Sequence, residues 1–454
     1  MVPHPPMIIP DVGRGSEAQI EKTVAAYRTV ARRIAELRPE TIIISSPHTV
    51  MYSDYFHISP GKGAKGSFAA YRAPQAAFRE RYDRALADGI CRIAEERDFP
   101  AGTLGERDPS LDHGTMIPLY FIEKEYTGFE IVRVGLSGLP LTMHYTLGMI
   151  IRDAVKETGR RAVFVASGDL SHKLKDYGPY GFAPEGPEYD ERIMDVCGRA
   201  AFGELFDFGE TFCDRAAECG HRSFVIMAGA LDGLSVKAEK LSHEDVTGVG
   251  YGICCFDPAG EDGERHFLDQ YLAREKEKLK EQREKEDPLV RLARRTVESF
   301  VLSGGEGTVP EWATPEMTGK RAGVFVSIHE HGRLRGCIGT ILPVTGSVAQ
   351  EIMDNAVSAC SRDPRFDPIL PEELPYLEIS VDVLTKPERI SGPEELDVKR
   401  YGVIVSSGAK RGLLLPDLDG VDTVEEQIDI ARRKGGIAEG APVVLERFEV
   451  IRHH

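Results

Sequence analysis

The chain has 454 residues, of which 41% are hydrophobic and 28% are charged, and its formal net charge is −17. This length predicts two or three domains of an ordinary globular protein, and the acidic balance argues against nucleic acid or an anionic membrane as a partner. The sequence has no long apolar run and no signal-peptide pattern, so we expect a cytoplasmic protein. Its eight cysteines lack CxxC and zinc-ribbon spacing, which is typical of buried thiols in a reducing compartment.

In the first part of the chain, apolar β-branched runs alternate with helical segments. Residues 41–46 (TIIISS), 129–137 (FEIVRVGLS) and 162–167 (AVFVAS) lack polar alternation, which is typical of parallel strands covered on both faces. Residues 17–37 have the periodicity of an amphipathic helix. These patterns predict an α/β domain over residues 1–258, with a mainly parallel sheet flanked by helices.

A charged segment then divides the chain. Residues 272–288 are almost wholly charged, with Glu and Lys four positions apart, and predict a solvated helix that ends at Pro288. We therefore expect a charged helical linker over residues 259–287 and a second domain over residues 288–454. A hairpin-like stretch, a helix from about Val348 to Ala359 and an alternating strand predict that this second domain is α+β.

Histidines recur in the loops of the first domain. His48 and His172 directly follow two of the predicted strands, whose carboxyl ends border the crevice in which open α/β sheets bind ligands. His4 and His113 lie in the loops VPHPP and LDHGT, which proline and glycine constrain. Two neutral imidazoles and one carboxylate can hold Fe(II) as a facial triad. A further histidine suits acid–base work, because its ordinary pKa lies near neutrality.

Two features near these histidines have more than one interpretation. Glu218, in AAECGHRSF before an apolar helix at 223–231, is the candidate carboxylate of the triad, or else an ordinary surface acid. In the turn before His172, Asp169 or Ser171 caps a following helix, or the turn directs His172 into a pocket.

The motifs VPHPPMIIP, SSPH, LDHGT, SGDLSHKL and ECGHRSFVIMAGAL, in this order, resemble the class III extradiol ring-cleavage dioxygenases, a LigB-like superfamily that includes the Memo proteins. The similarity covers about residues 1–258. It implies that His4 and His48 bind the metal and that His172 is the acid–base histidine. It also implies that His113 contacts substrate or oxygen, and we add Asp169, in the turn before His172, as a third catalytic candidate.

The third metal ligand departs from the dioxygenase pattern. Ring-cleaving members have a glutamate near this point, whereas Memo-type members have a cysteine in a Cys-Gly-x-His-Pro context. Here Glu218 and Cys219 are adjacent, and Gly220-His221 follows without a proline. We favour Glu218, because a carboxylate suits Fe(II) while a thiolate makes the site softer, and Cys219 is the alternative ligand.

The second domain carries GRLRGCIGT, NAVSACSRDPRFDPI and LEISVDVLT, which resemble the AMMECR family over about residues 288–454. The resemblance implies a two-part α+β fold without an assigned activity. Arg335 and Cys337 face a groove, or else Cys337 is buried in a tight strand crossing. Arg362 and Arg365 bind an anion, or else they pair with the neighbouring aspartates.

Together the resemblances imply an oxidoreductase: a non-haem, extradiol dioxygenase-like enzyme that uses Fe(II), or another divalent metal, to cleave a catechol-type aromatic ring with O2. The fusion also resembles the AmmeMemoRadiSam grouping. This implies an alternative, a Memo-like metal or redox protein that modifies a protein or peptide with a radical-SAM partner and does not cleave catechols. The chain itself lacks the CxxxCxxC motif of a radical-SAM cluster. A third hypothesis is a binding module without turnover, and a homo-oligomer is compatible with all three.

Overall fold

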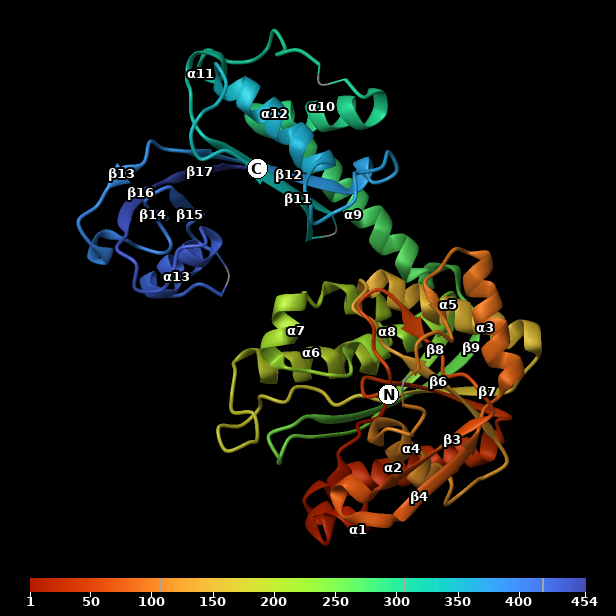
Figure 1. Cartoon of the computed structure of the whole chain (residues 1–454). Coiled ribbons are helices and arrows are strands. Elements are labelled where there is room, and N and C mark those ends of the chain that lie inside the picture. Colours follow the sequence, from red (N-terminus) through yellow and green to blue (C-terminus); the bar gives the residue numbers. More distant parts are fainter. Residues whose placement is uncertain (107, 306, 331, 419) are drawn as a thin grey trace. The chain divides into compact units, whose positions relative to one another are not determined.

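The computed structural model describes residues 1–454 except 107, 306, 331 and 419. The chain forms two compact units, Met1–Leu272 and Ala273–His454. The first is α/β and the second α+β, which confirms the predicted fold classes (Figure 1). Residues 259–272, which the charge pattern assigns to the linker, lie within the first unit. None of the described residues belongs to a helix long and apolar enough to cross a membrane.

The first unit is centred on a parallel three-stranded sheet with the strand order β6-β1-β7. Its strands are β1 (Thr41–Ser46), β6 (Glu130–Gly135) and β7 (Ala162–Ala166). The helices that pack on it are α2 (Glu21–Leu37), α3 (Arg84–Glu96), α4 (His113–Ile122) and α5 (Leu141–Thr158). Ile42 and Ile44 pack with α2 and α4, whereas Ile43 packs with α3 and α5. Both faces of β1 are therefore buried, which explains why its sequence has no alternation.

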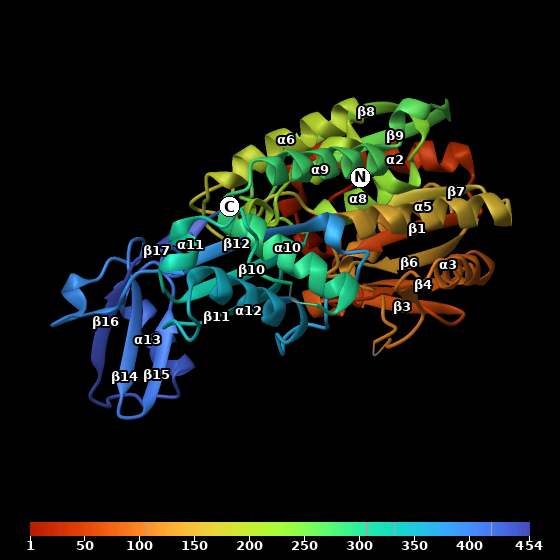
Figure 2. The ribbon, with the colours of Figure 1, turned by 90° about the horizontal axis from the view of Figure 1, so that it is seen from above.

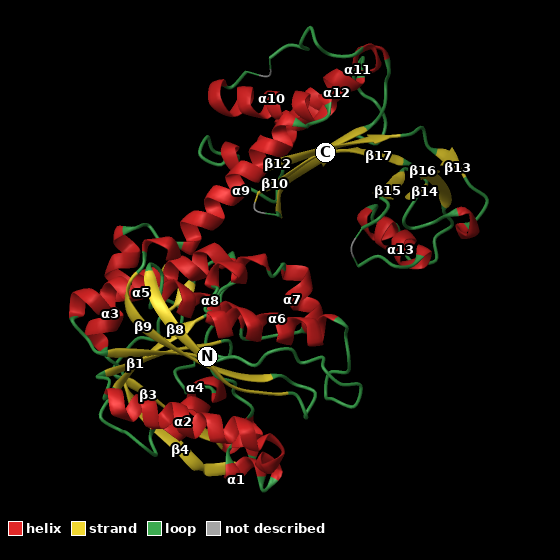
Figure 3. Ribbon diagram, turned by 180° about the vertical axis from the view of Figure 1, so that it is seen from behind, coloured by secondary structure: helices red, strands yellow, loops and turns green. Residues whose placement is uncertain are grey.

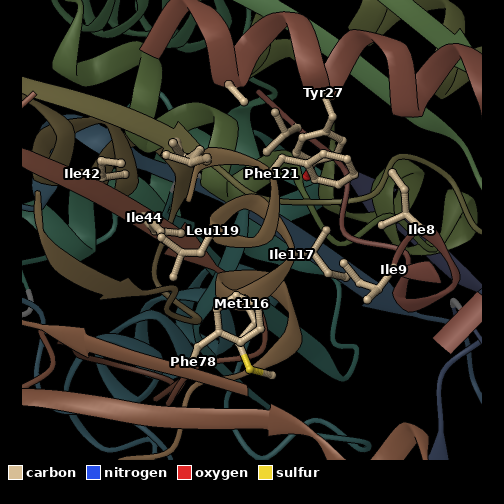
Figure 4. Packing of buried hydrophobic residues seen from close by; sticks show 14 of the residues in the cluster. Ile8, Ile9, Tyr27, Ile42, Ile44, Phe78, Met116, Ile117, Leu119 and Phe121 are labelled. Carbon is tan, nitrogen blue, oxygen red and sulfur yellow. The ribbon is translucent and has the colours of Figure 1, made fainter. Parts of the chain in front are cut away.

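One of the two cores beside this sheet supports the loops that carry the histidines. Tyr27 of α2 stacks on Phe121 of α4, with ring centroids 4.4 Å apart and planes inclined by 14° (Figure 4). The Tyr27 hydroxyl also donates a hydrogen bond to the carbonyl of Pro3, the residue before His4. The core thus fixes the N-terminal segment relative to helix α4, which begins at His113.

Further elements of the first unit are helices and antiparallel hairpins, of which the sequence predicted only the apolar helix at 223–231, the observed α8. The hairpins are β3–β4 (Gly63–Phe68 and Ala73–Arg81) and β8–β9 (Leu234–Glu244 and Tyr251–Glu261). The helices are α1 (Pro10–Gly13), α6 (Glu185–Arg199), α7 (Glu210–Ala216) and α8 (His221–Ala230), and the short parallel pair is β2 (Phe56–His57) with β5 (Ala101–Gly102).

The charged segment forms helix α9 (Phe267–Glu284), which spans the division between the units. The part before the charged segment packs against the core of the first unit through Phe267, Leu268 and Tyr271. Within the charged segment Leu279 is buried, so this segment is not wholly solvated. Pro288 does not end this helix but begins α10 (Pro288–Ser303), for which Asp287 is the N-cap. Proline suits this position because the first helical N–H needs no partner within the helix.

The second unit contains two antiparallel sheets, each accompanied by helices (Figures 2 and 3). Helices α10 and α12 (Val348–Ser361) share a core with the first sheet, which has the strand order β11-β10-β12-β17. Its strands are β10 (Val324–Glu330), β11 (Arg333–Gly339), β12 (Leu377–Leu384) and β17 (Val450–His453). The second sheet has the strand order β13-β16-β14-β15 and packs with α13 (Val424–Lys434). Its strands are β13 (Glu388–Arg389), β14 (Gly402–Ser407), β15 (Lys410–Leu414) and β16 (Val444–Phe448). The unit also contains the short helix α11 (Pro315–Gly319).

The LRGCIG segment forms most of β11 and packs tightly on α12. A Cβ atom on Gly336 would lie 2.2 Å from the carbonyl oxygen of Ala359, so only glycine allows this approach. Cys337 is half-buried, and its N–H donates to Asp363 at 2.9 Å. Arg365 pairs with the same carboxylate at 2.7 Å, which favours the internal ion pair over an anion-binding role for this arginine.

We predict that a fragment of residues 1–272 folds alone and is more stable than a fragment of residues 1–258. The shorter fragment lacks Phe267, Leu268 and Tyr271, which are partly buried, so each contributes less than the about 1.5–3 kcal/mol of a fully buried apolar side chain. Urea unfolding of both fragments measures the difference. Equal free energies of unfolding would show that this part of α9 does not belong to the first core.

Candidate metal centre

The N-terminal segment and two parallel strands bring the predicted histidines to one edge of the sheet. Val2 runs beside β7, since its N–H donates to Ala166 and its carbonyl accepts from Gly168, both at 2.9 Å. His48 follows β1, the neighbour of β7 in the sheet. Because the carboxyl ends of parallel strands share an edge, His4, His48 and the turn after β7 meet there.

Three side chains at this edge form a candidate metal-binding group. His4 Nε2 lies 3.0 Å from His48 Nε2 and 3.5 Å from Cys219 Sγ. The candidate ligand atoms of these residues all lie within 4.8 Å of one another. In the described part of the chain no other cluster of three or more His, Cys, Asp or Glu side chains meets this condition.

The tautomer of His4 follows from its hydrogen bonds. The hydroxyl of Ser167 donates to the carbonyl of Gly114 at 2.6 Å, so it accepts from His4 Nδ1 at 3.0 Å. With its proton on Nδ1, a neutral His4 directs the Nε2 lone pair toward His48 and Cys219. A hydrogen bond at the other ring nitrogen is the usual arrangement of a metal-binding histidine.

Burial sets the protonation of the donor atoms. It lowers the pKa of His4 to about 3, with a further contribution from His48, and it also lowers the pKa of His48. Both imidazoles are therefore neutral at physiological pH. Burial raises the pKa of the Cys219 thiol well above its usual value, so metal binding must release this proton. Two neutral nitrogens and one sulfur fit a transition-metal ion.

A contact between two glycines places Cys219 in this group. A Cβ atom on Gly168, in the turn after β7, would lie 2.1 Å from the Cα atom of Gly220, which precedes α8. The backbones can touch only because both residues lack side chains. As a result, the N–H of Asp169 donates to Cys219 Sγ at 3.3 Å.

Glu218, the favoured third ligand, lies elsewhere. Its carboxylate accepts a hydrogen bond from the N–H of His221 at 2.5 Å, which satisfies a free amide in the first turn of α8. Burial raises the pKa of Glu218 to about 7. The structure thus differs from the favoured assignment and places the alternative, Cys219, beside the two histidines. The neighbouring His221 is buried and hydrogen-bonds the carbonyl of Leu205 at 2.9 Å.

His113 lies beside the same group. Its ring centroid is 4.0 Å from that of His48 and 5.4 Å from that of His4. Burial lowers its pKa to about 3. Because it begins helix α4, its position depends on the N-cap residue Asp112, whose side chain accepts from the N–H of Thr115 at 3.0 Å.

Asp112 also connects His113 with His48 through a buried ion pair. Arg133 of β6 lies 3.3 Å from the Asp112 carboxylate, and Ser46 donates to the same carboxylate at 2.7 Å, two residues before His48. Burial alone would raise the pKa of Asp112, but Arg133 and these hydrogen bonds hold it below its ordinary value. The sequence analysis missed Arg133, although an arginine inside an otherwise apolar strand is a visible signal.

His172 lies near this group without belonging to it. Its ring stacks on Tyr180, with centroids 5.1 Å apart and planes inclined by 27°. Its Nε2 is buried and has no hydrogen-bond partner among the described residues, and burial lowers its pKa. A neutral imidazole with a free nitrogen can accept a proton from a bound molecule.

The turn before His172 does not cap a helix. Asp169 accepts from the N–H of His4 at 2.7 Å, while Ser171 donates its N–H to Asp190 at 2.9 Å. Burial raises the pKa of Asp169 to about 6. These contacts exclude the helix-cap interpretation of the turn, and the interpretation in which the turn directs His172 into a pocket stays a prediction.

Comparisons with known proteins assign both parts of the chain to known families. The family described as the catalytic LigB subunit of aromatic ring-opening dioxygenase matches residues 1–254, and the AMMECR1 family matches residues 290–453. Protein CA_C1420 of Clostridium acetobutylicum is 39% identical over 461 residues, covering 100% of this chain and 98% of its own. A Thermotoga maritima protein is 48% identical over 170 residues, covering 37% of this chain and 98% of its own. The crystal structure of the uncharacterized protein PH0010 from Pyrococcus horikoshii is 32% identical, with a TM-score of 0.34, and covers 36% of this chain and 88% of its own. The predicted family resemblances are confirmed.

We predict that His4→Ala and His48→Ala each abolish stoichiometric metal binding, because each removes one of three donor atoms. Metal content per chain after anaerobic purification tests this, with circular dichroism as the control for folding. Wild-type metal content in both folded variants would place the site elsewhere.

Separate substitutions of Glu218 and Cys219 should show which of the two residues binds the metal. Cys219→Ser should lose the metal and keep its stability. Glu218→Ala should keep the metal and lose about 1 kcal/mol of unfolding free energy, the usual net contribution of one hydrogen bond, here the bond from the N–H of His221. The reverse pattern of metal loss would restore Glu218 as the ligand.

Proposed function

Because the chain belongs to the family of the catalytic LigB subunit of aromatic ring-opening dioxygenases and carries an AMMECR1 domain, we propose that its N-terminal domain is a metal-dependent oxidoreductase of the Memo-like type. His4, His48 and Cys219 would hold the metal. The observation that carries the proposal is the position of Cys219 Sγ, 3.5 Å from His4 Nε2. A bound transition metal would supply redox or Lewis-acid chemistry, and a thiolate ligand favours softer ions than the carboxylate of an Fe(II) triad.

The residues around this group would handle the substrate and its protons. His172, through its free Nε2, would accept a proton from the substrate and return it later, and Tyr180 would hold its ring in place. His113 would contact the substrate beside His48. Asp169 would keep the N-terminal segment in register through its hydrogen bond to the N–H of His4.

Two exposed aromatic side chains beside the histidines support a protein or peptide as the substrate. Tyr180, which stacks on His172, is 59% exposed, and Tyr71, which contacts His113 at 5.8 Å between ring centroids, is 37% exposed. Exposed aromatic side chains are typical of surfaces that contact other proteins. The AmmeMemoRadiSam resemblance adds a radical-SAM protein as the proposed partner.

A second candidate function is extradiol cleavage of a small catechol with Fe(II) and O2. One observation favours it: His172 and His113 both lie beside the metal-binding group without belonging to it. These are the two histidines that the dioxygenase resemblance uses for proton transfer and for contact with substrate or oxygen.

An oxygen-electrode assay with a panel of catechols, combined with metal analysis of anaerobically purified protein, distinguishes these functions. We expect about one metal ion per chain and no catechol-dependent oxygen uptake. Uptake that depends on catechol and disappears in His172→Ala would favour the second candidate. Protein that neither retains nor binds added transition metals would indicate a binding module.

We predict that His172→Ala keeps wild-type metal content and folding. Turnover of whichever substrate the domain proves to use should fall by roughly 10²–10⁴-fold, because that is the usual contribution of a positioned acid–base group. Metal analysis and a rate assay of the same preparation test this. A metal-free variant would mean that His172 is a ligand.

A further inference from the structure

The β3–β4 hairpin is basic within an acidic protein. Residues 62–81 contain five basic residues and one acidic residue, whereas the whole chain has a net charge of −17. The basic residues are Lys62, Lys65, Arg72, Arg79 and Arg81. The local excess of positive charge therefore opposes the charge of the rest of the chain.

Three of these cations share the exposed face of the hairpin. Lys65 lies directly opposite Arg79, and Arg81 lies opposite Gly63. The alternate positions, which include Phe78, face the core. Like charges directly opposite one another destabilise an antiparallel pair. The repulsion between Lys65 and Arg79 therefore destabilises the hairpin, and a bound anion would remove this repulsion.

The cations of this face are only partly paired with acidic side chains of the described residues. Neither Lys65 nor Arg79 has a carboxylate within ion-pair distance among them. Arg81 lies 3.4 Å from Glu130, yet its side chain is 78% exposed. Glu80, on the opposite face of its strand, interacts with Glu123, whose pKa is raised to about 8 by burial and by this neighbour.

A groove of about 570 Å³ runs beside these cations. Its lining includes the four cations Lys62, Lys65, Arg79 and Arg81 and two acidic residues, Glu80 and Asp108, together with Pro109 and Ser110. The Asp108 carboxylate accepts hydrogen bonds from Ser110, so the cations remain in excess. The backbone of residues 108–110 is fixed on both sides, because Leu111 N–H donates to the Lys65 carbonyl at 2.9 Å and Arg133 donates to the Pro109 carbonyl at 3.4 Å. The groove thus borders the segment that leads directly into Asp112 and His113.

We propose that this groove binds an extended, acidic segment of a partner polypeptide. Arg79 and Arg81 are two positions apart on a strand, so their side chains leave the same face at a spacing of about 7 Å. An extended peptide with acidic residues at alternate positions presents carboxylates at the same spacing. A nucleic acid fits less well, because a long polyanion extends beyond the basic hairpin over a chain with a net charge of −17, whereas a short acidic segment can lie on the hairpin alone. The inference does not depend on the chemistry of the metal centre.

Fluorescence anisotropy with the full chain tests this proposal. The probe is a labelled decapeptide of alternating Glu and Ser, with a Gln and Ser decapeptide and a labelled thymidine decanucleotide as comparisons. Binding of the acidic peptide alone, weakened by salt, is expected. Lys65→Glu combined with Arg79→Glu should weaken it at least about tenfold, as reversal of facing charges does at other interfaces.

A matched control separates the groove from the overall charge. Lys22→Glu combined with Lys237→Glu makes the same change in net charge at two other exposed positions of the first unit, and its affinity should stay within about twofold of wild type. Lys65→Gln combined with Arg79→Gln should also lose affinity without loss of thermal stability. No preference for the acidic peptide, equal losses in the control, or tighter binding of the oligonucleotide would each overturn the proposal.

Discussion

The candidate metal centre depends on the contact between Gly168 and Gly220. These residues belong to the turn after β7 and to the start of α8, and they touch at a distance that excludes any side chain. The contact brings Cys219 to within 3.5 Å of His4 Nε2 and lets the backbone of Asp169 hydrogen-bond its sulfur. A Cβ atom at either position would separate the turn from the helix, and the cysteine would move away from the histidines while the sheet remained intact.

This dependence explains which parts of the site can be read from the sequence. The convergence of His48 and His172 follows from two buried strands and the rule that parallel strands end at one edge of a sheet. The choice between Glu218 and Cys219 depends on the directions of two adjacent side chains, which neither the local motif nor the chemistry of the two residues determines. These directions are set by the start of α8 and by Gly168, which lies fifty residues earlier in the chain. The hairpin β3–β4 was missed because its strands are rich in small and charged residues, which have low strand propensity.

A second constraint is the buried pair of Arg133 and Asp112. Burial of two charges costs free energy that the pair recovers only when further hydrogen bonds satisfy it. Here Ser46 and Thr115 supply those bonds, and they belong to the segments that carry His48 and His113. The main effect of the pair is therefore to fix the positions of His48 and His113 relative to each other, and not to stabilise the fold. Arg133 also donates a hydrogen bond to the carbonyl of Pro109, in the backbone segment that lines the basic groove.

The electrostatics of the centre follow from its burial. His4, His48 and His113 are held neutral, and the Cys219 thiol is held protonated, so the ligand group has no charge of its own before a cation binds. A divalent cation that displaced the thiol proton would leave one positive charge in a largely buried place. Asp169, buried beside His4, is positioned to offset that charge. The hydrogen bond from the N–H of His4 offsets part of the cost of burying Asp169, and a bound cation would offset more of it.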